Sequence, residues 1–154
     1  MNARTFVDSN ILLYARDSSE PDKQPIAEAE LRRLWESRGG RLSTQVLNEF
    51  FVNATQKLKP GLSAEDAWDD VVLLRAWNPL PLDSALLERG FSIHRRHKLS
   101  WRDSLIIAAA DATGCGTILS EDLSDGQAYD GIEVRNPFKS LKRRRQSKGQ
   151  NKHQ

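Results

Sequence analysis

Four acidic side chains have types and positions suited to binding a divalent cation. Asp8 ends a short β-rich run near the start of the chain, and Asp122 comes just after a second such run. Glu49 and Asp103 each lie in the first turns of a predicted helix. Carboxylates that converge repel one another unless a cation neutralises them, and oxygen ligands of this kind suit Mg²⁺ or Mn²⁺. A fold that gathers these acids would therefore hold a metal able to activate water.

Each of these acids also has a purely structural interpretation. Asp103 stands three residues after Ser100 and could complete a helix capping box, whereas Asp8 and Asp122 could belong to turns. Glu49 could lie on a solvated helix face. Because the chain holds 21 acidic residues, no single one identifies a site. The hypothesis of a site therefore depends on their joint placement.

The elements that must position these acids alternate between β-rich runs and helical patterns. Strands are expected at residues 4–8, 41–44, 117–120 and 132–135. Helices are expected at residues 11–14, 25–38, 46–58, 63–78 and 84–97, and between Ser100 and Gly114. Strands separated by helical crossovers predict an α/β fold with a largely parallel sheet, in which functional sites gather at the carboxyl ends of the strands. Asp8 and Asp122 should share that edge.

The predicted helix that carries Asp103 has the most distinctive sequence. Residues 105–110 are apolar nearly all round, which is typical of a helix buried on most sides. Asp103 precedes this apolar body in the first turn, so its carboxylate is expected near the same sheet edge. Glu49 lies about 130° from the centre of the apolar stripe of its own helix, at roughly 100° per residue. It is therefore not expected in the core.

Composition limits the class of protein. The chain has 154 residues, of which 38% are hydrophobic and 29% are charged, and this suits one folded domain. No apolar run approaches the roughly 20 residues of a membrane span. The single cysteine, Cys115, excludes an intramolecular disulfide and a cysteine-rich zinc site. We expect a cytoplasmic protein without membrane association, with Cys115 as an inert buried thiol.

The segment 139–154 carries the largest local charge. It holds seven basic residues and no acid, which gives it a net charge of +7. Residues 1–138 hold 16 basic and 21 acidic residues, a net charge of −5. Because Leu141 is its one large apolar side chain, we expect residues 139–154 to form a disordered basic tail. Such a tail could attach to nucleic acid electrostatically, or it could be a solvated extension that only aids solubility.

Four motifs, in order along the chain, resemble those of PIN-domain ribonucleases. They are TFVDSNILLY at 5–14, STQVLNEF at 43–50, LSWRDSLIIAAA at 99–110 and LSEDLSDGQ at 119–127, followed by NPF at 136–138. The resemblance covers residues 4–138 and is strongest to the VapC toxins of bacterial toxin–antitoxin pairs. It implies a PIN-like nuclease domain over residues 1–138, with the basic tail outside it.

The resemblance implies a three-layer α/β/α sandwich around a mostly parallel sheet, usually dimeric. It places Asp8, Glu49, Asp103 and Asp122 at the catalytic site, with Asp8 and Asp103 as ligands of Mg²⁺, and with Mn²⁺ as the alternative ion.

At the family's fourth acidic position, the chain offers three neighbouring acids. These are Glu121, Asp122 and Asp125, of which Asp122 aligns best.

These motifs lead to a functional hypothesis with two alternatives. The hypothesis is a Mg²⁺-dependent endoribonuclease that acts as a toxin on RNA and is held inactive by a cognate antitoxin. The alternatives are a PIN nuclease of RNA processing without an antitoxin, and a noncatalytic RNA-binding protein of the same fold. Retention of all four acids argues against the noncatalytic alternative. A mononucleotide-binding protein is ranked last because no glycine-rich phosphate loop follows the first strand.

Several polar side chains are candidate RNA contacts. The basic stretch 94–98 could hold phosphates, because a body of net negative charge needs local cations to attract a polyanion. The candidates are Ser9, Thr44, Arg95, Arg96, Lys98, Arg143, Arg144 and Arg145. For His94 and His97, the favoured interpretation is instead the solvated end of a helix. Trp101 could stack on a base, although a tryptophan at a helix start more often packs against the protein.

Overall fold

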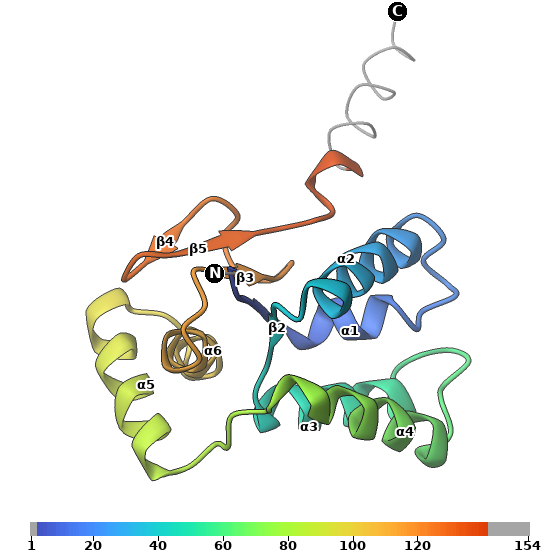
Figure 1. The fold of residues 1–154 in the computed structure, drawn as a ribbon, viewed down its shortest axis with the longest axis horizontal. Coiled ribbons are helices and arrows are strands. Elements are labelled where there is room, and N and C mark those ends of the chain that lie inside the picture. The colour runs from blue at the N-terminus through green and yellow to red at the C-terminus, as the bar shows by residue number, and fades with distance from the viewer. Residues whose placement is uncertain (1–2, 142–154) are drawn as a thin grey trace, which may run out of the picture.

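The structure is a computed structural model and describes residues 3–141. Groups of helices separate its first three strands, and the last three strands follow one another (Figure 1). They are β1 (Thr5–Val7), α1 (Ser9–Tyr14), α2 (Lys23–Ser37), β2 (Gly40–Arg41), α3 (Thr44–Gln56), α4 (Ala64–Leu74), the 3-10 helix η1 (Arg75–Trp77), α5 (Ser84–His97), α6 (Trp101–Ala112), β3 (Thr117–Leu119), β4 (Ala128–Tyr129) and β5 (Ile132–Arg135).

The strands form one sheet in the order β2-β1-β3-β5-β4. The pairs β1–β2, β1–β3 and β3–β5 are parallel, whereas β4 runs antiparallel to β5. This confirms the predicted α/β fold with a mostly parallel sheet. Because Val7 is paired with Leu119, the segments that leave the carboxyl ends of β1 and β3 start side by side.

Strand β4 was not predicted from the sequence. It pairs with β5 through a two-residue turn formed by Asp130 and Gly131, both of which have positive φ angles of 52° and 84°. Asp-Gly is a favoured dipeptide for such tight hairpins because both positions need this backbone conformation. The sequence therefore contains a hairpin signal at Asp130-Gly131, between the two strands.

Most predicted helices are confirmed, and serine caps fix several of their starts. Ser43 Oγ accepts a hydrogen bond from Val46 N, so α3 begins at residue 44 and the strand expected over 41–44 ends early, at Arg41. Ser63 Oγ and Ser100 Oγ cap α4 and α6 in the same way. Helix α5 spans the predicted residues 84–97. Helix α4 is shorter than predicted because the last turn before Asn78 is the 3-10 helix η1.

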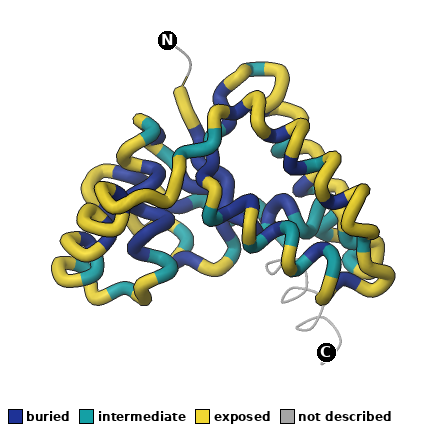
Figure 2. Tube along the Cα trace, turned by 90° about the horizontal axis from the view of Figure 1, so that it is seen from below, coloured by how far each residue is buried: buried dark blue, intermediate teal, exposed yellow. Residues whose placement is uncertain are grey.

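The core lies between the sheet and the helices. Residues 104–110 of α6 are all buried, as the apolar sequence predicts. Helices α5 and α6 lie beside the β3–β5 half of the sheet, whereas α1 to α4 gather toward the β2 end (Figure 1). In Figure 2, buried residues run through the middle of the molecule and exposed residues line its outer sides.

The described part of the chain extends past the predicted domain boundary at 138. Phe138 is buried, and Leu141 packs against the core and donates its N–H to Phe138 O. Of the predicted basic tail, only residues 139–141 are described. Arg143, Arg144 and Arg145 lie outside the described residues.

Cys115 is buried, as expected, and burial raises the pKa of its thiol. The thiolate is the reactive form, so a raised pKa favours the inert thiol at neutral pH. Within residues 3–141, no helix combines the length and apolar character needed to span a membrane.

We predict that Gly40→Ala destabilises the fold. A Cβ at residue 40 would stand 2.6 Å from the buried indole of Trp77. Moving the ring away should lower the free energy of unfolding by about 1–3 kcal/mol, measured by urea denaturation. Gly116→Ala is the matched control, because no atom lies within 4 Å of a Cβ there. Equal stability of the two variants would contradict this account of the Trp77 packing.

Candidate active site

Asp8 is the most deeply buried carboxylate of the candidate site. It directly follows β1, caps the start of α1, and its side chain is 0% exposed. Its Oδ1 accepts a hydrogen bond of 2.7 Å from Ser9 N, and its Oδ2 accepts one of 2.8 Å from Ser120 Oγ. Ser120 directly follows β3, so the parallel pairing of β1 and β3 brings this donor to the acid.

Arg102 stands at the centre of the acidic residues. Its Nη2 lies 2.5 Å from Asp8 Oδ1 and 2.6 Å from Glu49 Oε2, and its Nη1 lies 3.2 Å from Asp103 Oδ1. These three acids come from the N-cap of α1, from α3 and from α6, so one guanidinium joins three segments that are far apart in the sequence. The sequence prediction missed Arg102, although its position next to Asp103 in the third motif could have drawn attention to it.

Glu49 is held from two further directions. Ser9 Oγ donates to Glu49 Oε2 at 2.8 Å, which gives Ser9 a place inside the site. Gln45, one turn earlier on α3, donates its Nε2 to Glu49 Oε1 at 3.4 Å. The carboxamide oxygen of Gln45 is buried and has no hydrogen-bond partner among the described residues. An acceptor left without a donor beside these carboxylates is suited to a bound ion or water.

Asp122 lies at the edge of this cluster. Its Oδ2 accepts a hydrogen bond of 3.0 Å from Asn10 Nδ2, and its backbone N–H donates to Ser120 Oγ. Ser120 Oγ in turn donates to Asp8, so Asp122 is connected to Asp8 through one hydroxyl. Asp122 forms no ion pair with Arg102 among the contacts of the described chain.

The two neighbouring acids have other contacts. Glu121 accepts hydrogen bonds from Tyr14 Oη at 2.6 Å and from Lys23 Nζ at 2.8 Å. Asp125 accepts from Asn136 N and pairs with Lys139. Asp122, through its backbone N–H, contacts the Ser120 hydroxyl that binds Asp8.

The site has more negative than positive charge. Burial lowers the pKa of Arg102, but hydrogen bonds to Glu49 and Asp8 raise it further, so the net shift is upward and the guanidinium stays charged. One guanidinium thus faces three carboxylates, two of which are partly exposed. Excess negative charge of this kind favours binding of a further cation.

The carboxylates supply suitable ligands for the expected Mg²⁺, but Arg102 stands among them. Across residues 3–141, no three His, Cys, Asp or Glu side chains are arranged to hold a metal ion as they stand. The donor set itself fits, since Asp8, Glu49 and Asp103 provide hard oxygen atoms around a single guanidinium, and Gln45 adds a buried acceptor. These residues could bind a divalent ion where the guanidinium now lies.

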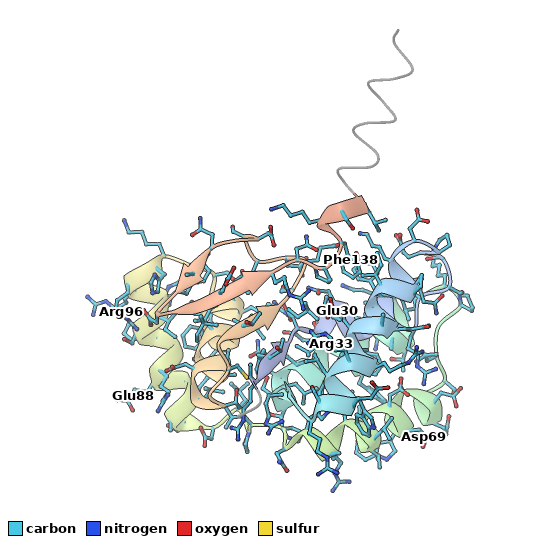
Figure 3. The ribbon with its side chains drawn as sticks, turned by 45° about the horizontal axis from the view of Figure 1, so that its top comes forward. Glu30, Arg33, Asp69, Glu88, Arg96 and Phe138 are labelled. Atoms are coloured by element: carbon cyan, nitrogen blue, oxygen red, sulfur yellow. The ribbon has the colours of Figure 1, made fainter. Side chains whose placement is uncertain are left out.

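The other candidate RNA contacts lie apart from the carboxylates. Thr44 Oγ1 accepts a hydrogen bond from Leu82 N and so holds the loop before α5. Arg96 forms a bidentate pair with Asp130, and Arg95 lies over the ring of Phe91. Figure 3 shows Arg96 and Glu88 at the outer side of α5. Lys98, the residue that ends α5, is exposed.

His94, His97 and Trp101 form local contacts at the α5–α6 junction. The Nδ1 atom of His94 is 2.6 Å from Leu99 O, and His97 pairs with Asp130. This agrees with the structural interpretation of both histidines. Trp101 makes an edge contact with His94 but is 43% exposed, so part of its indole faces solvent.

The fold and the motif order define a mostly parallel α/β protein with acids gathered at the carboxyl edge of its sheet. The family model of the PIN domain matches residues 5–124, and the chain belongs to this family. No curated protein sequence matches the chain.

Three solved structures share this fold. A toxin–antitoxin complex from Klebsiella pneumoniae is 18% identical with a TM-score of 0.60, over 86% of this chain and 97% of that one. VapC20 of Mycobacterium tuberculosis, a toxin that cleaves the sarcin–ricin loop, is 21% identical with a TM-score of 0.56, over 74% and 86% of the two chains. VapBC2 of Rickettsia felis, bound to a DNA fragment from its promoter, is 14% identical with a TM-score of 0.58, over 86% and 97%.

We predict that Ser120→Ala weakens the arrangement around Asp8. Ser120 is fully buried, and its hydroxyl both donates to Asp8 Oδ2 and accepts the N–H of Asp122. Losing these bonds should lower the free energy of unfolding by about 1–3 kcal/mol in urea denaturation. Ser92→Ala, on the exposed side of α5, should leave stability unchanged. A Ser120→Ala protein as stable as Ser92→Ala would show that this hydroxyl does not support the buried carboxylate.

Proposed function

We propose that this protein is a Mg²⁺-dependent endoribonuclease and the toxin of a VapBC-type toxin–antitoxin pair. The observation that carries the proposal is the convergence of Asp8, Glu49 and Asp103 at the carboxyl edge of a PIN-domain sheet. Three acids from separate segments would repel one another there without a cationic partner. A protein that only bound RNA would have no use for so concentrated a negative charge, because RNA is itself a polyanion.

The site residues have distinct roles in this proposal. Asp8 and Asp103 would hold the divalent ion, which when bound would make a water molecule more acidic and offset negative charge on the scissile phosphodiester. Glu49 and Asp122 orient the attacking water. Ser9 fixes the direction of the Glu49 carboxylate through its 2.8 Å bond, and Ser120 does the same for Asp8. Mn²⁺ is an alternative ion because it accepts the same oxygen ligands.

Positive charge outside the carboxylate cluster supports binding of RNA. Arg95 and Lys98, at the end of α5, are exposed. Trp101, the residue before Arg102 in the sequence, has a partly exposed indole on which an unpaired base could stack.

A protein partner is the second part of the proposal. Two of the solved structures with this fold are a toxin–antitoxin complex and a VapBC assembly, and the motifs of this chain resemble the VapC component. Large apolar side chains are exposed on α4, with Leu73 at 59%, as is typical of surfaces that bind another protein. We propose a cognate antitoxin as this partner, with the toxin acting in the cytoplasm as a homodimer.

The nuclease proposal predicts metal-dependent cleavage of RNA. Purified protein should cut total RNA with Mg²⁺ or Mn²⁺ and not with EDTA. Asp103→Asn and Asp8→Asn should each reduce the rate by about 10²-fold or more, since each removes a charged ligand from the site. Asp103 is the more informative position because its side chain is partly exposed, whereas the buried Asp8 also caps α1.

Asp111→Asn is the control for this experiment, because Asp111 lies at the far end of α6 and pairs only with exposed Arg89 among the described residues. Circular dichroism should show all variants folded. Cleavage that persists in EDTA or in both site variants would refute the assigned mechanism. RNA binding without cleavage under any metal condition would indicate a noncatalytic RNA-binding protein.

The toxin proposal predicts that expression of this chain alone arrests bacterial growth. Co-expression of the small gene adjacent to it should restore growth, whereas the Asp103→Asn protein should not arrest growth at all. Colony counts after induction provide the measurement. An active nuclease that leaves growth unaffected would instead indicate a PIN nuclease of RNA processing.

A further inference from the structure

Arg102 contacts the same oxygen atoms that a divalent ion would need. Its guanidinium donates to Asp8 Oδ1, Glu49 Oε2 and Asp103 Oδ1 at 2.5, 2.6 and 3.2 Å. Among the described residues, it is the one basic side chain that forms ion pairs with these three acids. It comes from the residue next to Asp103, so the fold itself delivers this cation to the cluster.

We infer that Arg102 is an internal competitor of the divalent cation and sets the metal concentration at which the site loads. This inference rests on the proposed metal-dependent function and goes beyond it, because it assigns the metal affinity to a residue that is not a ligand.

Geometry makes joint occupancy unfavourable. Mg²⁺ binds oxygen at about 2.0–2.1 Å and needs several oxygens around one point. The guanidinium instead separates the carboxylates, which approach its nitrogens at hydrogen-bond distances. Two cations at this point would also repel each other. For the metal to bind Asp8 and Asp103 together, the guanidinium has to leave.

Arg102 cannot yield the position by losing its proton. Its hydrogen bonds to Glu49 and Asp8 raise the pKa of a group that is already charged at every physiological pH. The side chain is 32% exposed, so it has access to solvent and can turn outward when the ion enters. Metal binding is then coupled to a side-chain rotation and not to a titration.

The competing explanation is an ordinary structural ion pair that holds the carboxylates in place for the metal. The two roles predict opposite effects. If Arg102 only supports the carboxylates, its removal should weaken metal binding. If Arg102 competes, its removal should strengthen metal binding, because the apparent affinity of a site is reduced by the fraction of molecules in which that site is blocked.

The test is titration calorimetry with Mn²⁺ on the full chain, comparing wild type with Arg102→Gln. We expect Arg102→Gln to bind Mn²⁺ at least about tenfold more tightly than wild type. This factor follows when the site is free of the Arg102 guanidinium in about a tenth or less of the wild-type molecules. Arg16→Gln is the matched control, since Arg16 forms a bidentate pair with Asp70 outside the site, and it should bind as wild type does. Equal or weaker binding by Arg102→Gln would overturn the inference.

Thermal unfolding gives a readout that is independent of nuclease activity. Without metal, Arg102→Gln should melt below wild type because three carboxylates lose their shared counterion. Addition of Mn²⁺ should raise its melting temperature more than that of wild type. If Arg102→Gln does not fold, Arg102→Lys decides the question. Lysine keeps the charge but lacks the planar fork that reaches several carboxylates, so it should bind Mn²⁺ more tightly than wild type; equal or weaker binding would overturn the inference.

The outcomes separate this inference from the proposed function. Equal Mn²⁺ affinities together with metal-dependent RNA cleavage would refute the role of Arg102 and leave the nuclease intact. Tighter Mn²⁺ binding by Arg102→Gln without any cleavage would support the role of Arg102 and refute the nuclease. Absence of Mn²⁺ binding in both proteins would overturn both.

Discussion

The fully buried carboxylate of Asp8 is the constraint on which the site depends. A charge without access to water is costly unless hydrogen bonds and an opposite charge replace its hydration. In this protein those partners come from three places: the first turn of α1, the residue after β3 and the start of α6. The parallel pairing of β1 with β3 and the burial of α6 are therefore conditions for a stable Asp8 as well as features of the fold.

The same contacts show why the structural and chemical interpretations of these acids are not exclusive. Asp8 caps α1 through the N–H of Ser9 and also faces Arg102. Asp103 receives the serine cap of α6 at its backbone while its side chain points to the same guanidinium. The starts of α1 and α6 thus hold the carboxylates of Asp8 and Asp103 in fixed positions. The proposed roles of Arg102 and of the divalent ion both follow from the negative charge gathered there.

Much of the fold was predictable because it follows from local patterns. The apolar body of α6, the capping serines and the periodicity of α5 each act within a few residues, so their interpretation does not require the partner elements. Strand β4 was missed even though Asp130-Gly131 is a strong hairpin signal, because its two residues form a strand only by pairing with β5. The early end of β2 has a similar cause, since Ser43 is used to cap α3.

The sequence by itself determined the order of four acids on an α/β scaffold, and with it the sheet edge at which they meet. Only the tertiary structure decided which of them share a contact. Asp8, Glu49 and Asp103 meet at Arg102, Asp122 reaches Asp8 through Ser120, and Glu121 turns to Tyr14 and Lys23. The position of Arg102 next to Asp103 could be noticed in the sequence, but its contacts could not be derived, because the partners of a long, flexible side chain depend on segments far away in the sequence. Spacing fixes where a backbone position lies, whereas electrostatics between folded segments fixes where such a side chain points.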